Sequence, residues 1–391
     1  MRQFPLRPTW AEIELSAIAH NVREFRQVAS PGTRVMAVVK ADGYGHGAVA
    51  VAREAVSAGA SFLGVATVEE ALELREGGIA APILVLGFTS RDYAPLLLQY
   101  GIVATVFTLA EAEAFSRAAL CLGRKLAVHV KIDTGMSRVG WFPCETADGF
   151  VSQLASLPGL ELEGIFTHFA AADQADLAYT RWQLGRFLAL CDKLALLGIR
   201  IPLRHVANSA ATLCLSAAHL EMVRVGIGLY GLSPGDEVPT SAVRLQPAMT
   251  LKSRVVMLKE VPAGTSVSYG CTYTTTDTCL LATLPVGYGD GYPRRLSNLG
   301  QVLIRGQRAP VVGRVCMDQM VVRVDGIQGI EAGDEAVLFG AQGEALLPAD
   351  EVAAWLGTIN YEVVTAVSRR VPRVYLRQGR IESVRPCFST R

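Results

Sequence analysis

The sequence predicts an α/β fold in which an N-terminal (β/α)8 barrel of the TIM type is followed by a mainly antiparallel β domain. Two observations predict the barrel. Eight short runs rich in β-branched residues alternate with helical patterns over about the first 230 residues. The runs are apolar along nearly their whole length, as parallel strands covered on both faces are. A third observation predicts the β domain: from about residue 243 the runs alternate in polarity and are joined by glycine-rich turns.

The expected elements follow in chain order. The barrel strands cover the ranges 34–40, 61–67, 82–87, 101–107, 126–133, 160–168, 202–208 and 222–229. Helical patterns lie between them at 47–58, 68–77, 109–122, 145–156 and 174–197. The boundary lies in LSPGDEVPTSAV, which is rich in Pro, Gly and Ser, so the barrel takes residues 1–242 and the β domain, with one helix near 348–356, takes residues 243–391. An open doubly wound sheet is the alternative, but no G-x-G-x-x-G motif follows the first strand.

Composition excludes several classes of protein. The 391 residues carry 37 Lys and Arg against 36 Asp and Glu, and a formal net charge of +1 lacks the basic excess of a nucleic-acid-binding protein. The longest stretch without a charge, 93–110, holds a proline and several polar residues, so we expect no membrane-spanning segment. No signal peptide is visible at the start, and the eight cysteines form no C-x-x-C pair. We therefore expect a globular cytoplasmic protein with neither a disulfide framework nor a zinc site.

Polar residues directly after predicted barrel strands are the first candidates for chemistry, because barrel active sites lie at the C-terminal ends of the strands. Lys40 ends an apolar strand and opens the glycine-rich turn ADGYGHG, in which Tyr44 offers a hydroxyl to an anion. A lysine held among apolar neighbours has a lowered pKa and can act as the nucleophilic amine of Schiff-base chemistry. The alternative for Lys40 is an ordinary surface lysine at a strand end.

A second cluster predicts a phosphate site. Asn208 and Ser209 follow the seventh strand at the start of a helix, where free backbone amides favour an anion. Gly226 and Gly228 lie at the end of the eighth strand and let backbone amides approach a ligand. Phosphate groups in barrels often bind to the loops after these two strands. Taken alone, Ser209 is better explained as a simple helix cap.

Two further candidates lie inside or at the end of predicted strands. Arg224 on the eighth strand either points into the barrel mouth or forms a buried ion pair with a barrel carboxylate. His168 ends an otherwise apolar strand, where a hydrogen-bonded core histidine is the alternative to a catalytic group. Asp42, Asp133, Asp173 and His168 do not cluster at the spacing of metal ligands, so no metal site is predicted.

Ten segments, in order from Trp10 to about Arg373, resemble the alanine racemases, enzymes that use pyridoxal 5'-phosphate (PLP) to interconvert L- and D-alanine. The matching segments are WAEIELSAIAHNV, AVVKADGYGHG, VKIDTGMSRVG, GIFTHFAAAD, HVANSAATL, MVRVGIGLYGLSP, VSYGCTY, LPVGYGDGYPRRL, VGRVCMDQMVV, and INYEV followed by SRRVPR. The resemblance implies a PLP-binding barrel followed by a β domain. It also implies a homodimer with shared active sites that supplies D-alanine for peptidoglycan.

The resemblance further implies two proton carriers. Lys40 matches the lysine that binds PLP covalently and acts as the base on one face of the substrate Cα. Tyr269 in VSYG matches the opposite base, which the partner subunit contributes. Racemisation requires proton carriers on both faces of a planar Cα, so an amine and a phenol fill the two roles. His168 and Arg224 match a hydrogen-bonded chain to that tyrosine, and Arg224 also matches the residue facing the pyridine nitrogen of PLP.

The remaining matches concern binding. By resemblance, the phosphate-binding residues are Tyr44, Asn208, Ser209, Gly226, Ile227 and Tyr361. Arg138 matches an arginine near the PLP 3-oxygen and the substrate carboxylate, and Met317 matches a partner-subunit backbone donor to that carboxylate. Lys131 aligns with a lysine that CO2 carboxylates in many members. The run 288–295, which begins with Tyr288, matches the entryway that restricts the size of the substrate side chain.

Departures from the family pattern are few and avoid the matched residues. The middle residue of SRR at 368–370 replaces a common aromatic, and Gly289 replaces a commoner alanine, which we expect to loosen the entryway. A broader-specificity or serine racemase is the main alternative function. A PLP-binding regulator would not need the β domain with Tyr269 and Met317, and a PLP decarboxylase should lack Arg224 at the pyridine nitrogen. A Schiff-base aldolase would not explain the phosphate cluster.

Overall fold

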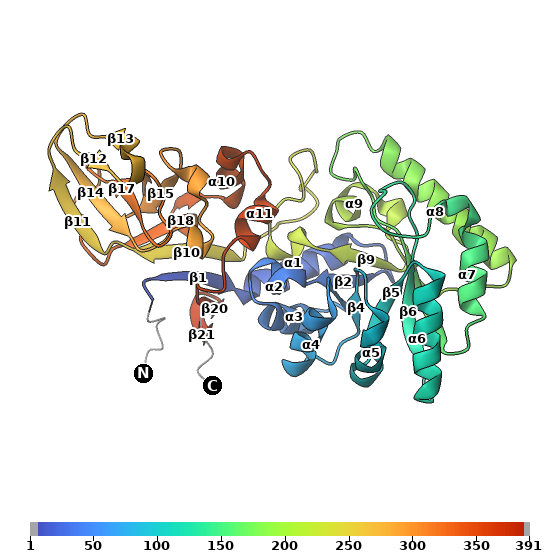
Figure 1. Ribbon diagram of the computed structural model, residues 1–391. Helices are drawn as coiled ribbons and strands as arrows, with labels where there is room; N and C mark the ends of the chain where they lie inside the picture. The colour runs from blue at the N-terminus through green and yellow to red at the C-terminus, as the bar shows by residue number, and fades with distance from the viewer. Residues whose placement is uncertain (1–6, 387–391) are drawn as a thin grey trace. The chain divides into compact units, whose positions relative to one another are not determined.

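Residues 7–386 are described by a computed structural model of the chain (Figure 1), and they form two compact units. The barrel unit consists of residues 17–43 and 48–246. The β unit consists of residues 7–16, 44–47 and 247–386. Among these described residues, no helix is both long enough and apolar enough to cross a membrane.

The barrel unit contains eight parallel strands. Their bounds are β2 (Arg34–Val38), β3 (Phe62–Val65), β4 (Ile83–Val85), β5 (Ile102–Val106), β6 (Leu126–Lys131), β7 (Leu160–Phe166), β8 (Leu203–His205) and β9 (Met222–Val225). They are hydrogen bonded in the order β8-β7-β6-β5-β4-β3-β2-β9. The Arg224 amide on β9 donates to the Ala207 carbonyl just beyond β8 at 2.9 Å, which brings the two ends of the sheet together. The predicted (β/α)8 barrel is therefore confirmed.

Apolar side chains fill the inside of this barrel. One buried cluster takes a side chain from each of six strands, namely Met36, Phe62, Leu84, Val103, Leu203 and Met222. Successive residues of a strand point to opposite faces of the sheet, so the apolar runs supply both this interior and the surface under the helices. The same alternation places some polar residues inside the barrel, where each needs a hydrogen-bond partner.

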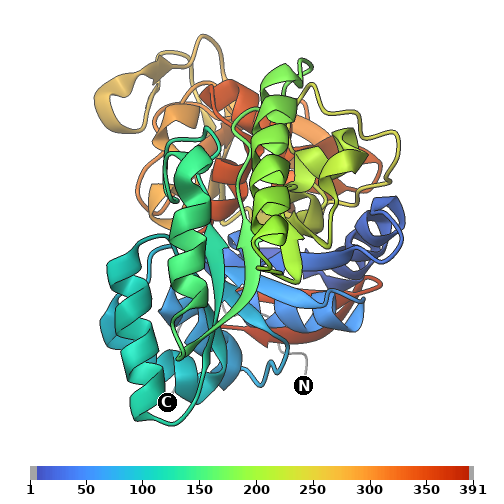
Figure 2. The same cartoon turned by 90° about the vertical axis from the view of Figure 1, so that its right-hand side faces the viewer.

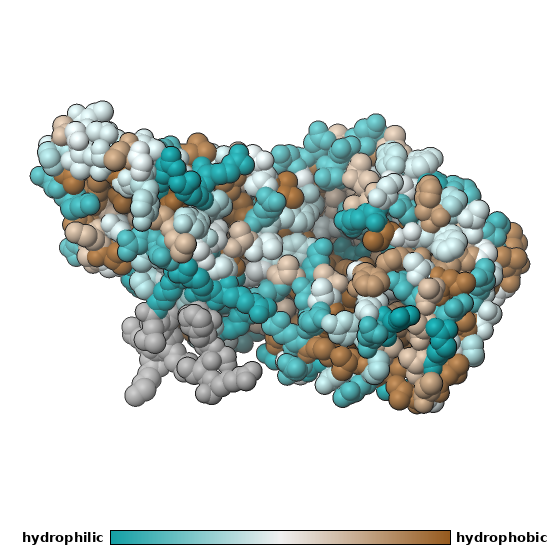
Figure 3. Space-filling view, in the orientation of Figure 1, coloured by the Kyte–Doolittle hydropathy of each residue, from teal (hydrophilic) through white to brown (hydrophobic). Residues whose placement is uncertain are grey.

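Helices cover the outer face of the barrel sheet (Figures 1 and 2). They are α1 (Leu15–Val28), α3 (Ala48–Ser57), α4 (Val68–Glu76), α5 (Ala94–Tyr100), α6 (Leu109–Cys121), α7 (Ala147–Ala155), α8 (Ala178–Leu196) and the short α9 (Ser209–Cys214). Two begin at threonine caps: Thr67 accepts the Glu70 amide at α4, and Thr108 accepts the Glu111 amide at α6. Each of the five predicted helical ranges contains a helix, whereas α1, α5 and α9 lie outside those ranges. Polar and apolar residues are interspersed over the outer helices on the face shown in Figure 3.

The β unit is mainly antiparallel, as predicted. Its larger sheet comprises β1 (Thr9–Glu14), β10 (Met249–Arg254), β15 (Gln301–Ile304), β16 (Gln307–Pro310), β18 (Glu335–Gln342), β19 (Ala345–Leu347), β20 (Arg373–Arg377) and β21 (Arg380–Arg385). The order is β16-β15-β18-β10-β1-β20-β21, with β19 on β18, and only the pair β1–β20 is parallel. The remaining elements are β11 (Met257–Val261), β12 (Ser266–Val267), β13 (Tyr273–Thr274), β14 (Cys279–Leu284), β17 (Met320–Arg323), α10 (Ala349–Leu356) and α11 (Asn360–Thr365).

Two segments from the first part of the chain belong to the β unit, whereas the sequence division places residues 1–242 in the barrel. The strand β1 joins the β unit because it lies between β10 and β20 in the larger sheet. Residues 44–47 join it because the Arg373 guanidinium donates two hydrogen bonds to the Gly45 carbonyl, at 2.9 and 2.8 Å. Both arrangements connect segments that are far apart in sequence, which a local pattern does not reveal.

Candidate active site

A left-handed backbone turn follows β2 and positions Lys40. Lys40 begins the short segment α2 (Lys40–Tyr44), in which Ala41 and Asp42 have φ angles of 52° and 54°. A left-handed conformation costs roughly 1–2 kcal/mol for each non-glycine residue, so surrounding contacts must hold the turn. One of them is the carboxylate of Glu70, which accepts the Ala41 amide at 2.6 Å. Backbone strain of this kind is typical of functional sites.

The electrostatic surroundings of Lys40 favour its neutral amine. Burial disfavours the ammonium form and lowers the pKa of Lys40; the positive charge of Arg138 lowers it further, whereas Glu70 raises it. Arg138 lies on the loop after β6, which Asp133 shapes by accepting two backbone amides at 2.8 and 3.1 Å. The neutral amine is the nucleophilic form of lysine. The surface-lysine alternative therefore does not describe Lys40, which is half-buried beside a second cation.

Arg224 on β9 is buried, with 4% of its surface exposed. Its guanidinium donates to the carbonyls of His205, Thr167 and Val206 at 2.8, 2.9 and 3.0 Å. It also lies 3.0 Å from Nδ1 of His205 and 3.0 Å from Nδ1 of His168. Burial lowers the pKa of Arg224 to about 9, which still leaves it charged at neutral pH. Within residues 7–386, its partners are carbonyls and imidazoles, so the alternative of an ion pair with a barrel carboxylate is not observed.

His168 is held in a defined protonation state by Arg224. A guanidinium can only donate hydrogen bonds, so Nδ1 of His168 must accept and its ring proton must be on Nε2. Burial, and then the positive charges of Arg224 and Lys131, lower the pKa of His168 well below its ordinary value. The ring is therefore neutral at neutral pH and offers one N–H donor from Nε2.

The loops after β8 and β9 meet, as the predicted phosphate site requires. Asn208 caps α9 by accepting the Ala211 amide at 2.9 Å. Ser209 is not the cap; its hydroxyl instead accepts the Gly226 amide at 2.9 Å and the Gly228 amide at 3.4 Å. Ile227 is buried and begins the turn that contains Gly228. The simple-cap alternative for Ser209 is therefore wrong, and the hydroxyl lies among backbone donors.

Lys131 is a second lysine with a perturbed pKa. It ends β6 and is buried, and its ammonium donates to the Ile132 carbonyl at 3.0 Å and lies 5.4 Å from the centre of the Phe166 ring. Burial, and then the charge of Arg224, lower the pKa of Lys131 to about 7, against the opposing effect of Asp133. A large fraction of the side chain is therefore neutral at neutral pH, and a neutral amine is the form that reacts with CO2.

The two predicted phosphate-binding tyrosines lie close together in the β unit. The rings of Tyr44 and Tyr361, the latter on α11, have centroids 6.1 Å apart. Burial raises the pKa of Tyr44 to about 12, so its hydroxyl remains protonated and can donate to an anion.

Three other predicted residues of the β unit point into solvent. Tyr269 is 73% exposed, Met317 is 51% exposed and Tyr288 is 42% exposed. Tyr269 follows a strained residue, Ser268, whose φ is 64° and whose hydroxyl donates to the Arg314 carbonyl at 2.6 Å. The Tyr288 and Met317 segments are adjacent, since backbone hydrogen bonds join residues 288 and 289 to residues 316 and 317. The β unit therefore presents these side chains outward on a fixed backbone.

Comparisons with known proteins cover nearly the whole chain. The family model described as "Alanine racemase, N-terminal domain" matches residues 13–234, and "Alanine racemase, C-terminal domain" matches residues 248–375. The chain belongs to the alanine racemase family. The alanine racemase of Desulfovibrio desulfuricans is 53% identical over 370 residues, which cover 95% of this chain and 98% of that protein. That of Methanococcus maripaludis is 46% identical over 369 residues, covering 94% and 99%.

Solved alanine racemase structures share the fold. The enzyme from Clostridium difficile has a TM-score of 0.93 and 42% identity, covering 98% of this chain and 99% of that chain. The enzyme from Bacillus anthracis, solved with bound L-Ala-P, has a TM-score of 0.91 and 39% identity, covering 97% and 98%. The family predicted from the ten segments is therefore confirmed.

Sequence reasoning missed a chain of hydrogen bonds inside the barrel of this alanine racemase family member. Nδ1 of His205 accepts from Arg224, so its Nε2 carries the proton and donates to Nδ1 of His129 at 2.8 Å. Nε2 of His129 then donates to the Glu163 carboxylate at 3.2 Å. Burial lowers the pKa of both histidines, which keeps both rings neutral. We call Arg224, His205, His129 and Glu163 the histidine relay.

The sequence contains a weak signal for this relay. His129 lies two residues before Lys131 on β6, so both side chains share the inward face of the strand. Gly164 is a second signal, because a Cβ at this position would lie 2.5 Å from Nδ1 of His129. Neither signal identifies the residues that bond to His129, because His205 and Glu163 lie on other strands.

Proposed function

We propose that this chain is a PLP-dependent alanine racemase that interconverts L- and D-alanine and supplies D-alanine for peptidoglycan. The observation that carries the proposal is Lys40: a half-buried lysine with a lowered pKa, on a strained turn at the C-terminal end of a barrel strand, beside Arg138. The relatives at about half identity over nearly the full chain bear names that state the same activity.

The residues present fit PLP. The Ser209 hydroxyl, which accepts the Gly226 amide, and the amide of Ile227, next to the cap residue Asn208, offer donors to a phosphate in the barrel unit. Tyr44, which stays protonated, and Tyr361 are the phosphate residues of the β unit. When bound at Lys40, PLP supplies an electron sink that makes the Cα proton of an amino acid removable.

The hydrogen bonds of Arg224 suit a pyridine nitrogen. Within the described residues, all of them leave from the two terminal nitrogens, so the Nε–H is the donor that remains for a ring nitrogen. Because arginine keeps its proton, that ring nitrogen must accept and stays unprotonated. An unprotonated ring withdraws electrons less strongly, which we infer restrains transamination and favours return of the proton to Cα.

Two groups would carry the proton on opposite faces of Cα. Lys40 serves one face as a neutral amine, and Tyr269 of the partner subunit serves the other. A free phenol has a pKa near 10 and is a poor base at neutral pH, so it needs a donor that stabilises its anion. The Nε2–H of neutral His168 is such a donor. Arg138 and the Met317 amide of the partner subunit would hold the substrate carboxylate.

A homodimer with shared sites explains the exposed side chains of the β unit. Tyr269, Met317 and Tyr288 project from its surface in the single chain, as residues offered to a second copy would. We place this enzyme in the cytoplasm; the cysteines among the described residues are all unpaired, which suits a reducing compartment.

Chiral analysis of the product tests the proposal. The purified protein, with PLP, should convert L-alanine to the racemate, and a panel of other L-amino acids including serine measures how far the substrate range extends. Lys40→Ala should abolish this conversion and the visible absorbance of bound PLP. Absence of racemisation in the PLP-loaded wild type, or an unchanged spectrum in Lys40→Ala, would overturn the assignment.

A further inference from the structure

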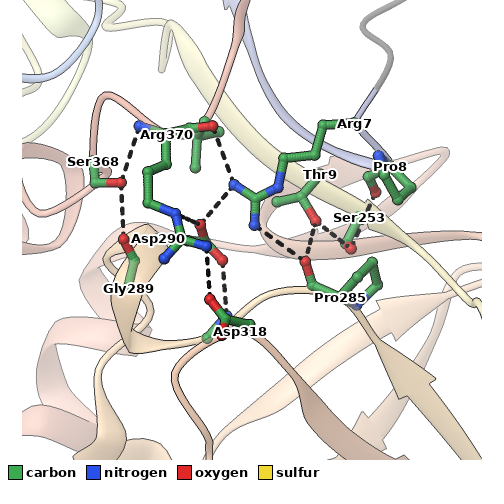
Figure 4. Close-up of polar contacts among 12 residues, drawn as sticks. Arg7, Pro8, Thr9, Ser253, Pro285, Gly289, Asp290, Asp318, Ser368 and Arg370 are labelled. Carbon is green, nitrogen blue, oxygen red and sulfur yellow. Dashed lines mark hydrogen bonds and ion pairs between the residues drawn. The ribbon is translucent and has the colours of Figure 1, made fainter. Parts of the chain in front are cut away.

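Asp290 is a buried carboxylate inside the entryway segment, which is only partly exposed. It ends the turn Tyr288–Asp290 and is 1% exposed. One oxygen lies 2.6 Å from the Arg7 guanidinium and 3.5 Å from that of Arg370, and the other accepts the Gly287 amide at 3.1 Å. Figure 4 shows Asp290 between the two arginines, which come from opposite ends of the chain. A buried carboxylate is costly unless it is paired. Here Oδ1 is paired by the charges of the two guanidinium groups, without a hydrogen bond of good geometry.

Arg370 extends this network to the residue that follows Met317. Its guanidinium donates to Asp318 at 2.6 Å, and Asp318 also lies beside the entryway turn in Figure 4. The charges therefore alternate in the order Arg7, Asp290, Arg370, Asp318. We call these four residues the entryway clamp.

Backbone contacts fix the other side of Met317. The Gly289 amide donates to the Met317 carbonyl at 2.9 Å, and the Tyr288 amide donates to the Cys316 carbonyl at 3.0 Å. These contacts require glycine at 287, because a Cβ there would lie 2.2 Å from the Cys316 carbonyl oxygen. Within residues 7–386, the Met317 carbonyl is thus engaged while its amide N–H donates to no other group. A peptide group that is fixed in place and has an available N–H can donate a hydrogen bond to a carboxylate.

Gly289 also belongs to this arrangement. A Cβ at Gly289 would lie 2.3 Å from Nη1 of Arg370, so the space of an alanine methyl is filled by the guanidinium. The Ser368 hydroxyl donates to the Gly289 carbonyl at 3.1 Å and holds the turn from a third direction. The glycine led us to expect a loosened entryway, and the structure gives no sign of one. Each residue of the turn Tyr288–Asp290 donates a backbone hydrogen bond.

We infer that Asp290 is a positioning residue for the substrate carboxylate. Through Arg370 and the turn Tyr288–Asp290, it fixes the direction of the Met317 amide that the proposed racemase offers to the partner's substrate. This inference rests on the proposed function. It predicts that weakening the clamp lowers the affinity for a carboxylate ligand before it affects PLP binding or proton transfer.

The test compares two clamp variants with a matched control. Asp290→Asn removes the buried charge at constant size, and Asp318→Asn removes the exposed end of the clamp. Asp334→Asn is the control, since this carboxylate also pairs with an arginine, Arg305 at 2.8 Å, but lies outside the clamp. The probes are alanine, for KM and kcat, and propionate, which is alanine without its amino group, for Kd on the PLP-loaded enzyme.

We expect both clamp variants to raise KM and the propionate Kd about tenfold, the effect of impairing one charge-assisted hydrogen bond. We expect kcat and the affinity for PLP to stay within about twofold of the wild type. The double variant should be no worse than the poorer single variant, because both act through Arg370. Asp334→Asn should change none of these quantities.

Other outcomes distinguish a failure of the positioning role of Asp290 from a failure of the proposed function. Clamp variants that match Asp334→Asn, or that lose kcat or PLP affinity at unchanged KM, would overturn the positioning role. If Asp290→Asn does not fold, the exposed Asp318→Asn decides by the same criteria. A PLP-loaded wild type that neither racemises alanine nor binds propionate would overturn the proposed function, and this inference with it.

Discussion

Replacing His205 by phenylalanine tests the histidine relay most sharply. His205 is fully buried and its ring stacks on Phe166, with centroids 4.7 Å apart and planes 8° apart, so a phenyl ring fits the same space. His205→Phe removes the 3.0 Å bond from Arg224 and the 2.8 Å bond to His129. Arg224 keeps the backbone carbonyl of residue 205 at 2.8 Å, but Nδ1 of His129 is left unpaired.

The expected magnitude follows from these lost bonds. A buried polar group without a partner costs about 1–3 kcal/mol, and a bond to a charged group contributes about 1.5–3 kcal/mol. We expect the barrel to lose about 2–4 kcal/mol of stability in denaturant unfolding, because the apolar ring offsets part of the sum. Thr105→Val is the control, since it removes one buried bond, from Thr105 to the Val85 carbonyl at 2.6 Å, and should cost about 1 kcal/mol.

Activity provides a second readout for His205→Phe. The relay orients the Arg224 guanidinium, which also donates to His168. We therefore expect kcat to fall by at least about tenfold, because misplacing a reacting group lowers the rate by such factors. Thr105→Val should retain its kcat. A His205→Phe protein as stable and as active as Thr105→Val would refute the relay as a device that positions Arg224.

Two further predictions follow from the remaining site residues. The pKa of Lys131 is lowered from an ordinary 10.5 to about 7, so the unfolded chain binds more protons between these values and stability should rise with pH across that window. In Lys131→Met the rise should be smaller, and a carbamate signal in 13C NMR under labelled CO2 should be absent; an identical pH profile would contradict the lowered pKa. Mixing the inactive variants Lys40→Ala and Tyr269→Phe should restore part of the activity through hybrid dimers, and no recovery under subunit exchange would argue for a site within one chain.

Much of the fold can be predicted from local patterns. Most barrel strands are apolar runs, because a strand covered on both faces needs apolar residues at nearly every position; the short β8, which contains Arg204 and His205, is an exception. The place of β1 cannot be read this way, since its neighbours β10 and β20 lie more than 200 residues further along the chain. The helix α5 is also hidden, because its apolar residues continue directly into β5 after Gly101.

The site residues also fall into those that a local sequence pattern reveals and those that it does not. Lys40, Asn208 and Ser209 are visible in the sequence because polar residues directly after apolar strands are unusual. His129 and His205 lie within strands, and only the folded barrel brings their rings together. The burial of Asp290 is equally hidden, since it depends on arginines at positions 7 and 370.

Proton removal from each enantiomer tests the two-base account most directly. Exchange of the Cα proton of L-alanine and of D-alanine with D2O can be followed separately by NMR at early times, for the wild type and for Tyr269→Phe. The account predicts that Tyr269→Phe loses exchange from L-alanine far more than from D-alanine, because Lys40 still serves the other face. Equal losses for the two enantiomers would contradict the assignment of Lys40 and Tyr269 to opposite faces.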